Sequence, residues 1–480
     1  MLNLTIKSPL KELAIFAAVF ACLTAQTAVA QNKLDSNKPN IIFILADDLG
    51  WRDVSFNGNT YLETPNIDKL STEGIVFKTA YTNAPNCAPT RACLMSGQYG
   101  PRHGIYTVAN SDRGSSVNRK LIPIKNNTIL PSSIVTLPEV LKSGGYTTGL
   151  FGKWHLGNSA GTRPEDQGFD VNIGGNLAGA PKTYFSPYGN PNIKDGPVGE
   201  ELTDRLANEA ITFIKENKKK PFFVYLPFYA VHTPIEAKPE LTEKYKTKKH
   251  SEERSNPKYA AMVENMDQNV GKVLAAVEQL GLTENTIVVF YADNGTYFPV
   301  SSAAPLRESK GSLYEGGVRV PLVVKWPGKI KAGSSSNEPV IGMDFYPTFL
   351  SITGISKPKQ ILDGIDISPA LFKNDKLNRE KLFWHFPAYL EKFPGMTKIW
   401  RETPGSTIRK GDWKLIQRFE DNSIELYNLK EDIGEKRNLL TSNPEKAKEL
   451  LSDLNTWRKE LNAPIPTELN PEYKIQTLNP

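Results

Sequence analysis

Short apolar runs, each long enough for one buried strand, alternate along this chain with stretches that carry one apolar face at helical spacing. The apolar runs occupy residues 41–45, 147–151, 222–226, 286–291 and 320–324. Amphipathic stretches cover residues 202–214 and 262–280, and Gly281 follows the second. Because parallel strands need long crossover connections, this alternation predicts an α/β fold with a large, mixed but mainly parallel sheet sandwiched by helices.

The composition of the chain changes after about residue 372. Lysine and asparagine become frequent, and short strand-like pieces follow at residues 413–416 and 425–427. A last amphipathic stretch begins at Asn443 and Pro444, which is a typical helix start. We therefore predict a catalytic α/β domain over residues 31–375 and a C-terminal α+β subdomain over residues 376–480, with a small antiparallel sheet and a terminal helix.

The first thirty residues resemble an export signal. Lys7 and Lys11 precede an apolar run over residues 13–23, and residues 28–30 offer a small-x-small cleavage site. We expect a signal peptide over residues 1–30 and a periplasmic or secreted protein. Lipid anchoring at Cys22 is the alternative, although the residues before it match a lipobox poorly. No later run is long and apolar enough to span a membrane.

Charge and cysteine content exclude several classes of protein. A formal net charge of +6 over 480 residues is too small to indicate a nucleic-acid partner. After cleavage only Cys87 and Cys93 would remain, so the fold does not depend on a disulfide framework. A disulfide between two cysteines so close in the sequence would restrict the unfolded chain little and would therefore add little stability. One of these cysteines is therefore a candidate for chemistry.

Polar residues collect where the predicted strands end, which is the edge at which α/β sheets bind ligands. The runs lead into Asp47 and Asp48, then Lys153 and His155, then His232, and finally Asp293 and Asn294. Carboxylate and amide oxygens are the ligands that Ca²⁺ and Mg²⁺ prefer. An isolated acidic pair is more often a turn or a helix cap, but two pairs that each follow a buried strand predict a cation site.

Cys87 stands in a segment rich in small residues and proline, which we expect to lead into a helix near Thr90. A cysteine there is either a thiolate nucleophile, stabilised by the helix N-terminus and Arg91, or a buried structural residue. The residue pattern alone leaves both interpretations open.

The segment Cys87-x-Pro89-Thr90-Arg91 resembles the signature of the type I sulfatases of the alkaline phosphatase superfamily. Further segments resemble motifs of that family and occur in the same order: residues 40–51, 152–157, 232–234, 293–295, 310–311 and 315–321. The similarity extends from about Pro39 to the C-terminus. It implies an alkaline phosphatase-like fold and hydrolysis of sulfate esters.

The resemblance also implies a set of roles. Cys87 would be oxidised by a separate formylglycine-generating enzyme to formylglycine (3-oxoalanine), whose hydrate attacks sulfur. One Ca²⁺ would be held by Asp47, Asp48, Asp293, Asn294 and the modified Cys87. Arg91 and Lys153 would balance charge, Lys310 and His232 would contact the sulfate and protonate the leaving alcohol, and His155 would accept a proton.

Sulfated carbohydrates, such as algal polysaccharide fragments or glycosaminoglycans, are the expected substrates. Arg52 is either a second anion contact or a surface residue, and His385 is either a sugar contact or a packing residue between the domains. Aromatic residues near the predicted pocket loops are candidates for sugar stacking: Trp51, Trp154, Tyr184, Phe185, Tyr188, Tyr297 and Trp384. The loops themselves, residues 158–199 and 296–309, are expected to form pocket walls.

Two other functions remain open at this point. A phosphate or phosphonate monoester hydrolase could use the same scaffold, although five histidines are too few for a histidine-rich two-zinc site. A non-catalytic binder of sulfated glycans could have kept the pocket.

Overall fold

The computed structural model describes residue 2 and residues 38–249 and 256–474. An eight-stranded sheet forms its centre. In spatial order its strands are β5 (Val171–Ile173), β4 (Thr147–Phe151), β6 (Phe222–Pro227), β1 (Asn40–Ala46), β7 (Thr286–Ala292), β8 (Leu322–Lys325), β2 (Ile75–Phe77) and β9 (Ser334–Ser336). In this spatial order the strands from β5 through β4, β6 and β1 to β7 run parallel to one another. Strand β8 is antiparallel to both of its neighbours, β7 and β2. The predicted mixed, mainly parallel sheet is confirmed.

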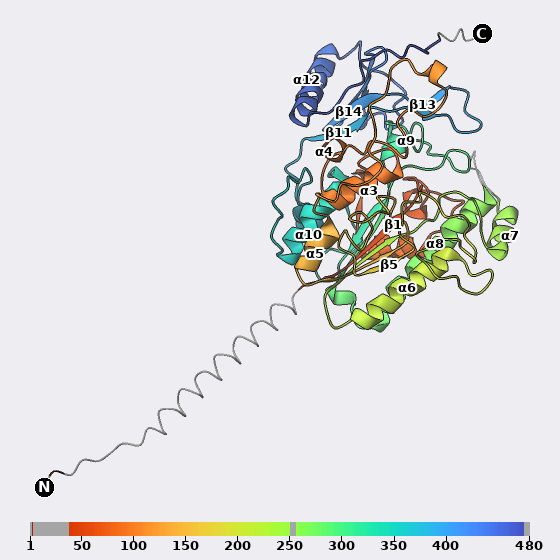
Figure 1. Cartoon of the computed structure of the whole chain (residues 1–480), viewed down its shortest axis with the longest axis vertical. Helices are drawn as coiled ribbons and strands as arrows, with labels where there is room; N and C mark the ends of the chain where they lie inside the picture. Colours follow the sequence, from red (N-terminus) through yellow and green to blue (C-terminus); the bar gives the residue numbers. More distant parts are fainter. Residues whose placement is uncertain (1, 3–37, 250–255, 475–480) are drawn as a thin grey trace.

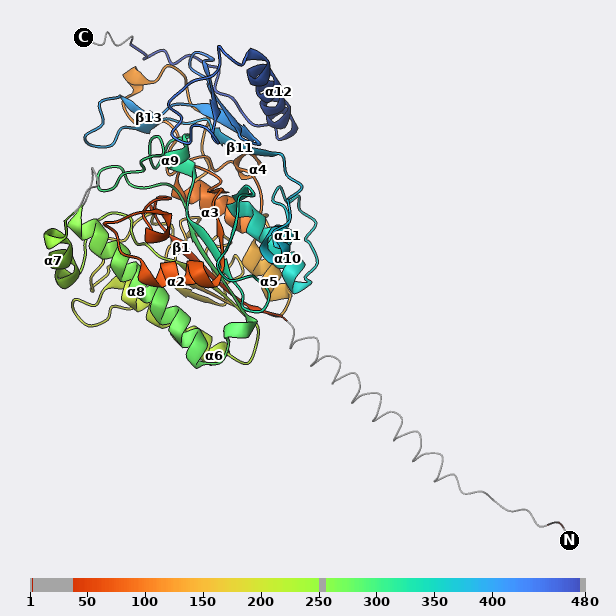
Figure 2. The same cartoon turned by 180° about the vertical axis from the view of Figure 1, so that it is seen from behind.

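Helices cover both faces of this sheet, as Figures 1 and 2 show. On one face α6 (Leu202–Asn217) packs against α8 (Pro257–Gln279), with α2 (Pro65–Glu73) and α7 (Pro239–Thr247) beside them. The other face carries α3 (Cys87–Ser96), α5 (Leu137–Ser143), α10 (Phe345–Thr353) and α11 (Ser368–Lys373). Strands β1, β6 and β7 are buried along their whole length, because helices exclude water from both sides of the sheet.

A second sheet lies above the first in Figure 1 and comes from the C-terminal part of the chain. Its antiparallel strands are β11 (Lys381–Phe386), β14 (Gly405–Lys410), β15 (Trp413–Arg418) and β16 (Ile424–Asn428), and α12 (Pro444–Glu460) packs on it. Its apolar core includes Tyr81, Cys93 and Leu313 from the larger part of the chain. The C-terminal unit is therefore joined to the main fold through a shared core.

Short elements complete the fold. They are β3 (Ala80–Tyr81), which pairs with β10 (Val340–Ile341), β12 (Leu390–Glu391), which pairs with β13 (Trp400–Glu402), and the short helices α4 (Gly100–His103) and α9 (Glu315–Val318). The predicted signal peptide and Cys22 fall outside the described residues. No helix of the described chain is both long and apolar enough to cross a membrane.

Candidate active site

The register of the central strands places two carboxylates side by side. Ala46 at the end of β1 pairs with Ala292 at the end of β7, so Asp47 and Asp293 leave the sheet at the same level. The backbone amide of Asp293 donates to the carbonyl of Ala46 at 3.1 Å. Both acidic residues are fully buried. The strand ends therefore converge as predicted.

Lys153 reaches the same point from β4. Gly152 precedes it with φ of 133°, and a Cβ at this glycine would lie 2.0 Å from the carbonyl oxygen of Pro227. Only glycine allows this close approach of the two backbones. The Lys153 amide then donates to that carbonyl at 2.7 Å, and its Nζ lies 2.5 Å from Oδ2 of Asp47.

Helix α3 begins at Cys87, three residues before the start predicted near Thr90. Pro89 is tolerated there because the first turn of a helix leaves its backbone amides unpaired. Arg91 lies one turn after Cys87 and is fully buried. Its Nε and Nη2 donate to Asp293 Oδ2 at 2.9 and 2.7 Å, and its Nη1 donates to the carbonyl of Lys153 at 2.8 Å. Cys87 and Cys93 are both buried, and neither forms a disulfide within the described chain.

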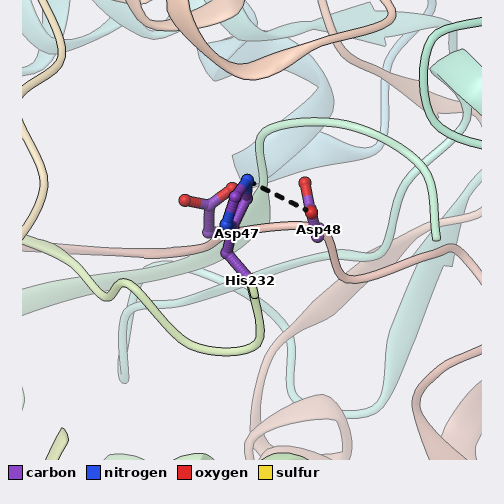
Figure 3. Close-up of side chains that lie close together, drawn as sticks. All are labelled: Asp47, Asp48 and His232. Carbon is purple, nitrogen blue, oxygen red and sulfur yellow. Dashed lines mark ion pairs between the residues drawn. The ribbon is translucent and has the colours of Figure 1, made fainter. Parts of the chain in front are cut away.

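Asp48 is surrounded by polar groups from three segments. Lys310 Nζ lies 2.6 Å from Oδ1 and 2.8 Å from Oδ2 of Asp48. Asn294 Nδ2 donates to Oδ1 at 2.8 Å. His232 Nε2 lies 3.7 Å from Oδ2, and Figure 3 shows its ring turned toward Asp48 with Asp47 beside them. The structure thus brings the predicted metal ligands and catalytic residues into one cluster.

The electrostatics of the cluster depend on burial. Three carboxylates face three cationic side chains, so the charges of these six residues balance. Burial raises the pKa of Asp293 to about 6, and nearby Asp47 adds to this shift. Burial also raises the pKa of Asp48, but Lys310 and His232 more than offset it and hold that pKa below its ordinary value. Burial, reinforced by Lys310, lowers the pKa of His232 to about 3.

Two oxygens of the cluster have no hydrogen-bond partner although they are buried: Oδ1 of Asp47 and Oδ1 of Asn294. An unpaired buried oxygen is costly unless a cation or a proton meets it. Ligand atoms of Asp47, Cys87 and Asp293 lie within 4.8 Å of one another. A hard divalent cation such as Ca²⁺ or Mg²⁺ fits this oxygen-rich donor set.

A cavity of about 430 Å³ opens above the cluster. It is lined by Asp48, Asn86, Cys87, Val108, Arg113, His155, Gly179, Ala180, His232, Thr233, Tyr297, Lys310, Phe393 and Arg401. Both long loops contribute to it, as predicted: Gly179 and Ala180 come from the first and Tyr297 from the second. Its size is typical of small-molecule sites in proteins.

The two substrate contacts proposed with alternatives do not line this cavity. Arg52 donates to the backbone carbonyls of Gly58 and Ala304. His385 is buried, and its ring nitrogens meet Ser406 Oγ at 2.7 Å and the Pro464 carbonyl at 2.9 Å. Burial lowers the pKa of His385 to about 3. The packing interpretation of His385 is therefore the one that its contacts support.

Most of the predicted sugar-stacking aromatic residues belong to the core instead. Trp154, Tyr184, Tyr188 and Trp384 are each exposed by 1% or less. Tyr297 is the one member of that set that lines the cavity. Sequence reasoning missed Arg113, Phe393 and Arg401, because they lie in segments without a recognisable motif. The change to Lys- and Asn-rich sequence marked the part of the chain that contains Phe393 and Arg401, but no such signal marked Arg113.

Comparisons with known proteins agree with this geometry. The Sulfatase family model matches residues 39–355, and the model for the C-terminal region of N-sulphoglucosamine sulphohydrolase matches residues 309–463. A sulfatase of Formosa agariphila is 38% identical, covering 91% of this chain and 92% of its own. The N-acetylgalactosamine-6-sulfatase of Mus musculus is 32% identical over 72% of this chain and 68% of its own.

Solved structures show the same relationship. The structure of Ps i-CgsB in complex with k-i-k-neocarrahexaose has a TM-score of 0.74 and 32% identity, covering 92% of this chain and 95% of that one. The family model alone spans more than half of the sequence. The chain therefore belongs to the sulfatase family and is a sulfuric ester hydrolase.

Proposed function

We propose that this protein removes sulfate from sulfated carbohydrates, using a formylglycine made from Cys87 and one bound Ca²⁺. The observation that carries the proposal is the position of Cys87. It lies at the start of a buried helix and lines the cavity, and its sulfur lies among the carboxylates of Asp47 and Asp293. Burial raises the pKa of the Cys87 thiol, so the unmodified residue is poorly suited to act as a thiolate.

The implied groups fit the residues around them. Asp47, Asp48, Asp293 and Asn294, with an oxygen of the modified Cys87, would hold Ca²⁺, and the unpaired oxygens of Asp47 and Asn294 support this assignment. The ion would supply positive charge for the sulfate oxygens, and formylglycine would supply a hydrated aldehyde as the nucleophile. A separate maturation enzyme would have to oxidise Cys87.

Arg91 and Lys153 hold the nucleophile's surroundings in place. Their side chains are fully buried, and each is fixed by a carboxylate, Asp293 for Arg91 and Asp47 for Lys153. Preorganised cations in a site that excludes water stabilise developing negative charge without rearranging. Both residues would therefore balance the charge on the nucleophile and on the sulfate.

Lys310 and His232 are the candidates for binding the sulfate, and the ammonium of Lys310 would protonate the leaving alcohol, whereas His232, with its lowered pKa, would contact the sulfate as a neutral ring. Both line the cavity, and their side chains are 11% and 16% exposed, so a substrate can reach them. His155 also lines the cavity, and its Nδ1 is buried without a hydrogen-bond partner. Burial lowers the pKa of His155, so its ring is neutral and would take up a proton when the aldehyde is restored after sulfur–oxygen cleavage.

Carbohydrate substrates are supported by the relatives. The similar proteins include N-acetylgalactosamine-6-sulfatases and a protein solved with k-i-k-neocarrahexaose. We further propose that the protein is exported to the periplasm or secreted, and that its catalytic domain ends near residue 375. An extracellular location would give it access to algal polysaccharides or glycosaminoglycans.

The test is the release of free sulfate, measured by ion chromatography. Matured wild-type protein, Cys87→Ala and the control Cys93→Ala would be incubated with sulfated oligosaccharides and with matched phosphate esters. We expect sulfate release by the wild type and by Cys93→Ala, but not by Cys87→Ala. Mass spectrometry of the peptide that contains residue 87 would establish whether the wild type carries formylglycine.

Two outcomes would contradict the proposal. Phosphate release above sulfate release would favour a phosphate or phosphonate monoester hydrolase. Binding of sulfated glycans that is equal in wild type and Cys87→Ala, with no turnover by the formylglycine form, would favour a binding protein.

A further inference from the structure

We propose that Arg401, with Arg113 beside it, forms a second anion-binding subsite that selects saccharides carrying another sulfate or a carboxylate near the ester that is cleaved. This inference rests on the proposed function and deepens it by naming the class of substrate. Both arginines line the cavity that contains Cys87 and Lys310. Neither belongs to the cluster around the cation site.

Arg401 lies in β13 and is only 7% exposed. Its Nε is buried without a hydrogen-bond partner, and the guanidinium has no ion pair within residues 38–249 and 256–474. Its position is set by aromatic contacts instead. The guanidinium carbon lies 3.7 Å from the centre of the Phe393 ring, and Phe393 meets Tyr297 edge to face at 5.0 Å. The side chain is therefore held in place with hydrogen-bond donors left unfilled.

The charges along this wall of the cavity do not cancel. Arg113 pairs with Glu391, and Lys310 pairs with Asp48, whereas no carboxylate of the described chain lies within ion-pair distance of Arg401, and Glu391 and Asp48 act on it only from farther away. Burial lowers the pKa of Arg401 to about 10, and Arg113 adds to this shift, so the guanidinium still carries its charge at neutral pH. A buried charge that forms no direct ion pair is unfavourable, even where carboxylates farther away offset part of the cost. An anion that enters the cavity would remove this cost.

The second anion would bind close to the scissile ester. A Cβ at Gly311, the residue after Lys310, would lie 2.6 Å from Nε of Arg401. The guanidinium therefore lies against the backbone next to a proposed sulfate contact. A cavity of about 430 Å³ has room for more than one sulfate group. A guanidinium fork binds both carboxylate and sulfate oxygens in pairs, so either group suits the subsite.

Lys398 lies on the same hairpin as Arg401 and takes part in a partly exposed ion pair, a kind of contact that contributes little to stability. Lys398 forms an ion pair with Glu308 at 2.7 Å, which joins the hairpin to the loop that also provides Tyr297. Lys398 does not line the cavity. It is therefore a matched control, since it is a cation on the same hairpin outside the cavity lining.

The experiment compares wild type, Arg401→Gln, Arg401→Lys and Lys398→Gln. Matched saccharides would carry one sulfate, two sulfates, or one sulfate and one uronate carboxylate. For Arg401→Gln we expect kcat/KM on at least one two-anion substrate to fall about 10- to 100-fold, mainly through KM. The loss on the monosulfated saccharide should be much smaller. Arg401→Lys should recover part of the loss, and Lys398→Gln should behave as wild type.

The two-sulfate and carboxylate substrates distinguish the two sources of the anion. A preference of the wild type for one of them, lost in Arg401→Gln, identifies the group that the subsite binds. An equal fall on monosulfated and two-anion substrates would overturn the proposal, because Arg401 would then act on the scissile sulfate or on the fold. The proposal would also be overturned if the kcat/KM of the wild type were no higher on two-anion saccharides than on the monosulfated one.

Failure of the proposed function would be separable from failure of this inference. If the wild type releases sulfate from no substrate, calorimetry would compare binding of the disulfated and the sulfated uronate saccharides to Cys87→Ala and to Cys87→Ala with Arg401→Gln. Weaker binding by the double variant supports the subsite, and equal binding overturns it. Thermal unfolding of Arg401→Gln provides the check on folding, and we expect little change in stability because the lost stacking on Phe393 is offset by removal of a buried charge that forms no ion pair in the described chain.

Discussion

Arg91 donates from Nε and Nη2 to the same carboxylate oxygen of Asp293, Oδ2, at 2.9 and 2.7 Å. The other oxygen of Asp293, Oδ1, is left on the side of the Asp48 backbone amide, which donates to it at 3.3 Å. This arrangement joins α3, which carries the proposed nucleophile, to the end of β7. It also leaves Oδ1 of Asp293 outside the contacts with Arg91.

Arg91→Lys tests the importance of the paired hydrogen bonds from the Arg91 guanidinium to Asp293, here called the fork. A lysine ammonium cannot span the Asp293 contacts and also reach the carbonyl of Lys153, so buried hydrogen bonds are lost although the charge remains. We expect the free energy of unfolding to fall by about 1–3 kcal/mol, and kcat to fall on the order of 100-fold because the nucleophile shifts. Urea unfolding and sulfate release measure the two effects. Arg52→Lys, outside the cavity, is the control, and equal behaviour of both variants would argue against the fork.

Removal of the cation should inactivate the enzyme. Dialysis against a chelator would leave three buried carboxylates without the charge that we propose for the site, so we expect lost sulfate release and a lower thermal midpoint. Added Ca²⁺ should restore both, and added Mg²⁺ shows whether the site discriminates between the ions. Protein that is shown by elemental analysis to be metal-free, and yet keeps full activity, would contradict the assignment.

Gly152→Ala should displace Lys153. The new methyl group would lie 2.0 Å from the carbonyl oxygen of Pro227, so β4 and β6 must move apart at the site. We expect a loss of about 2 kcal/mol or more in the free energy of unfolding, together with reduced kcat. Gly145→Ala is the matched control, since Gly145 also has positive φ, 90°, but has open space around its Cβ position. Equal effects of the two substitutions would show that backbone strain alone matters.

Glu201→Gln should change how stability depends on pH. Glu201 caps α6 and accepts hydrogen bonds from the Asp204 amide and from Asn265, and burial raises its pKa from 4.5 to about 7. Between these values the folded state holds a proton that the unfolded state has lost, so rising pH favours unfolding. This group then costs wild type about 1.4 kcal/mol per pH unit.

We therefore expect Glu201→Gln to gain stability relative to wild type as pH rises from 5 to 7. Chemical unfolding at several pH values measures the difference. Glu209→Gln, on the exposed side of the same helix, controls for the loss of a charge. A constant difference between wild type and Glu201→Gln across this range would contradict the raised pKa.

The centre of the site was predictable from the sequence because the fold determines it locally. In a parallel sheet, the residue after each strand lies at one edge, so Asp47, Lys153 and Asp293 had to meet once the strands were recognised. The family motifs added Cys87 and Lys310 to that edge. Helix α3 was predicted with a late start because Pro89 reads as a helix breaker unless its place in the first turn is known.

The outer wall of the cavity was not predictable in the same way. Arg113 lies in an irregular segment and Arg401 in the short strand β13, far apart in the sequence, and their approach depends on how the C-terminal unit packs on the main fold. His385 was a candidate sugar contact, but Ser406 and the Pro464 carbonyl occupy its ring nitrogens. Most of the large aromatic residues that were candidates for stacking on sugars are buried in the core, so their rings do not face the cavity.

The in-register pairing of β1 with β7 has a consequence for how this enzyme fails. Asp47 and Asp293 follow paired residues of two fully buried strands at the middle of the sheet, so they cannot separate unless backbone hydrogen bonds between these strands open. This pair of carboxylates therefore has no low-energy route of its own to disorder. Inactivation by heat should coincide with global melting, without a folded but inactive population along the way.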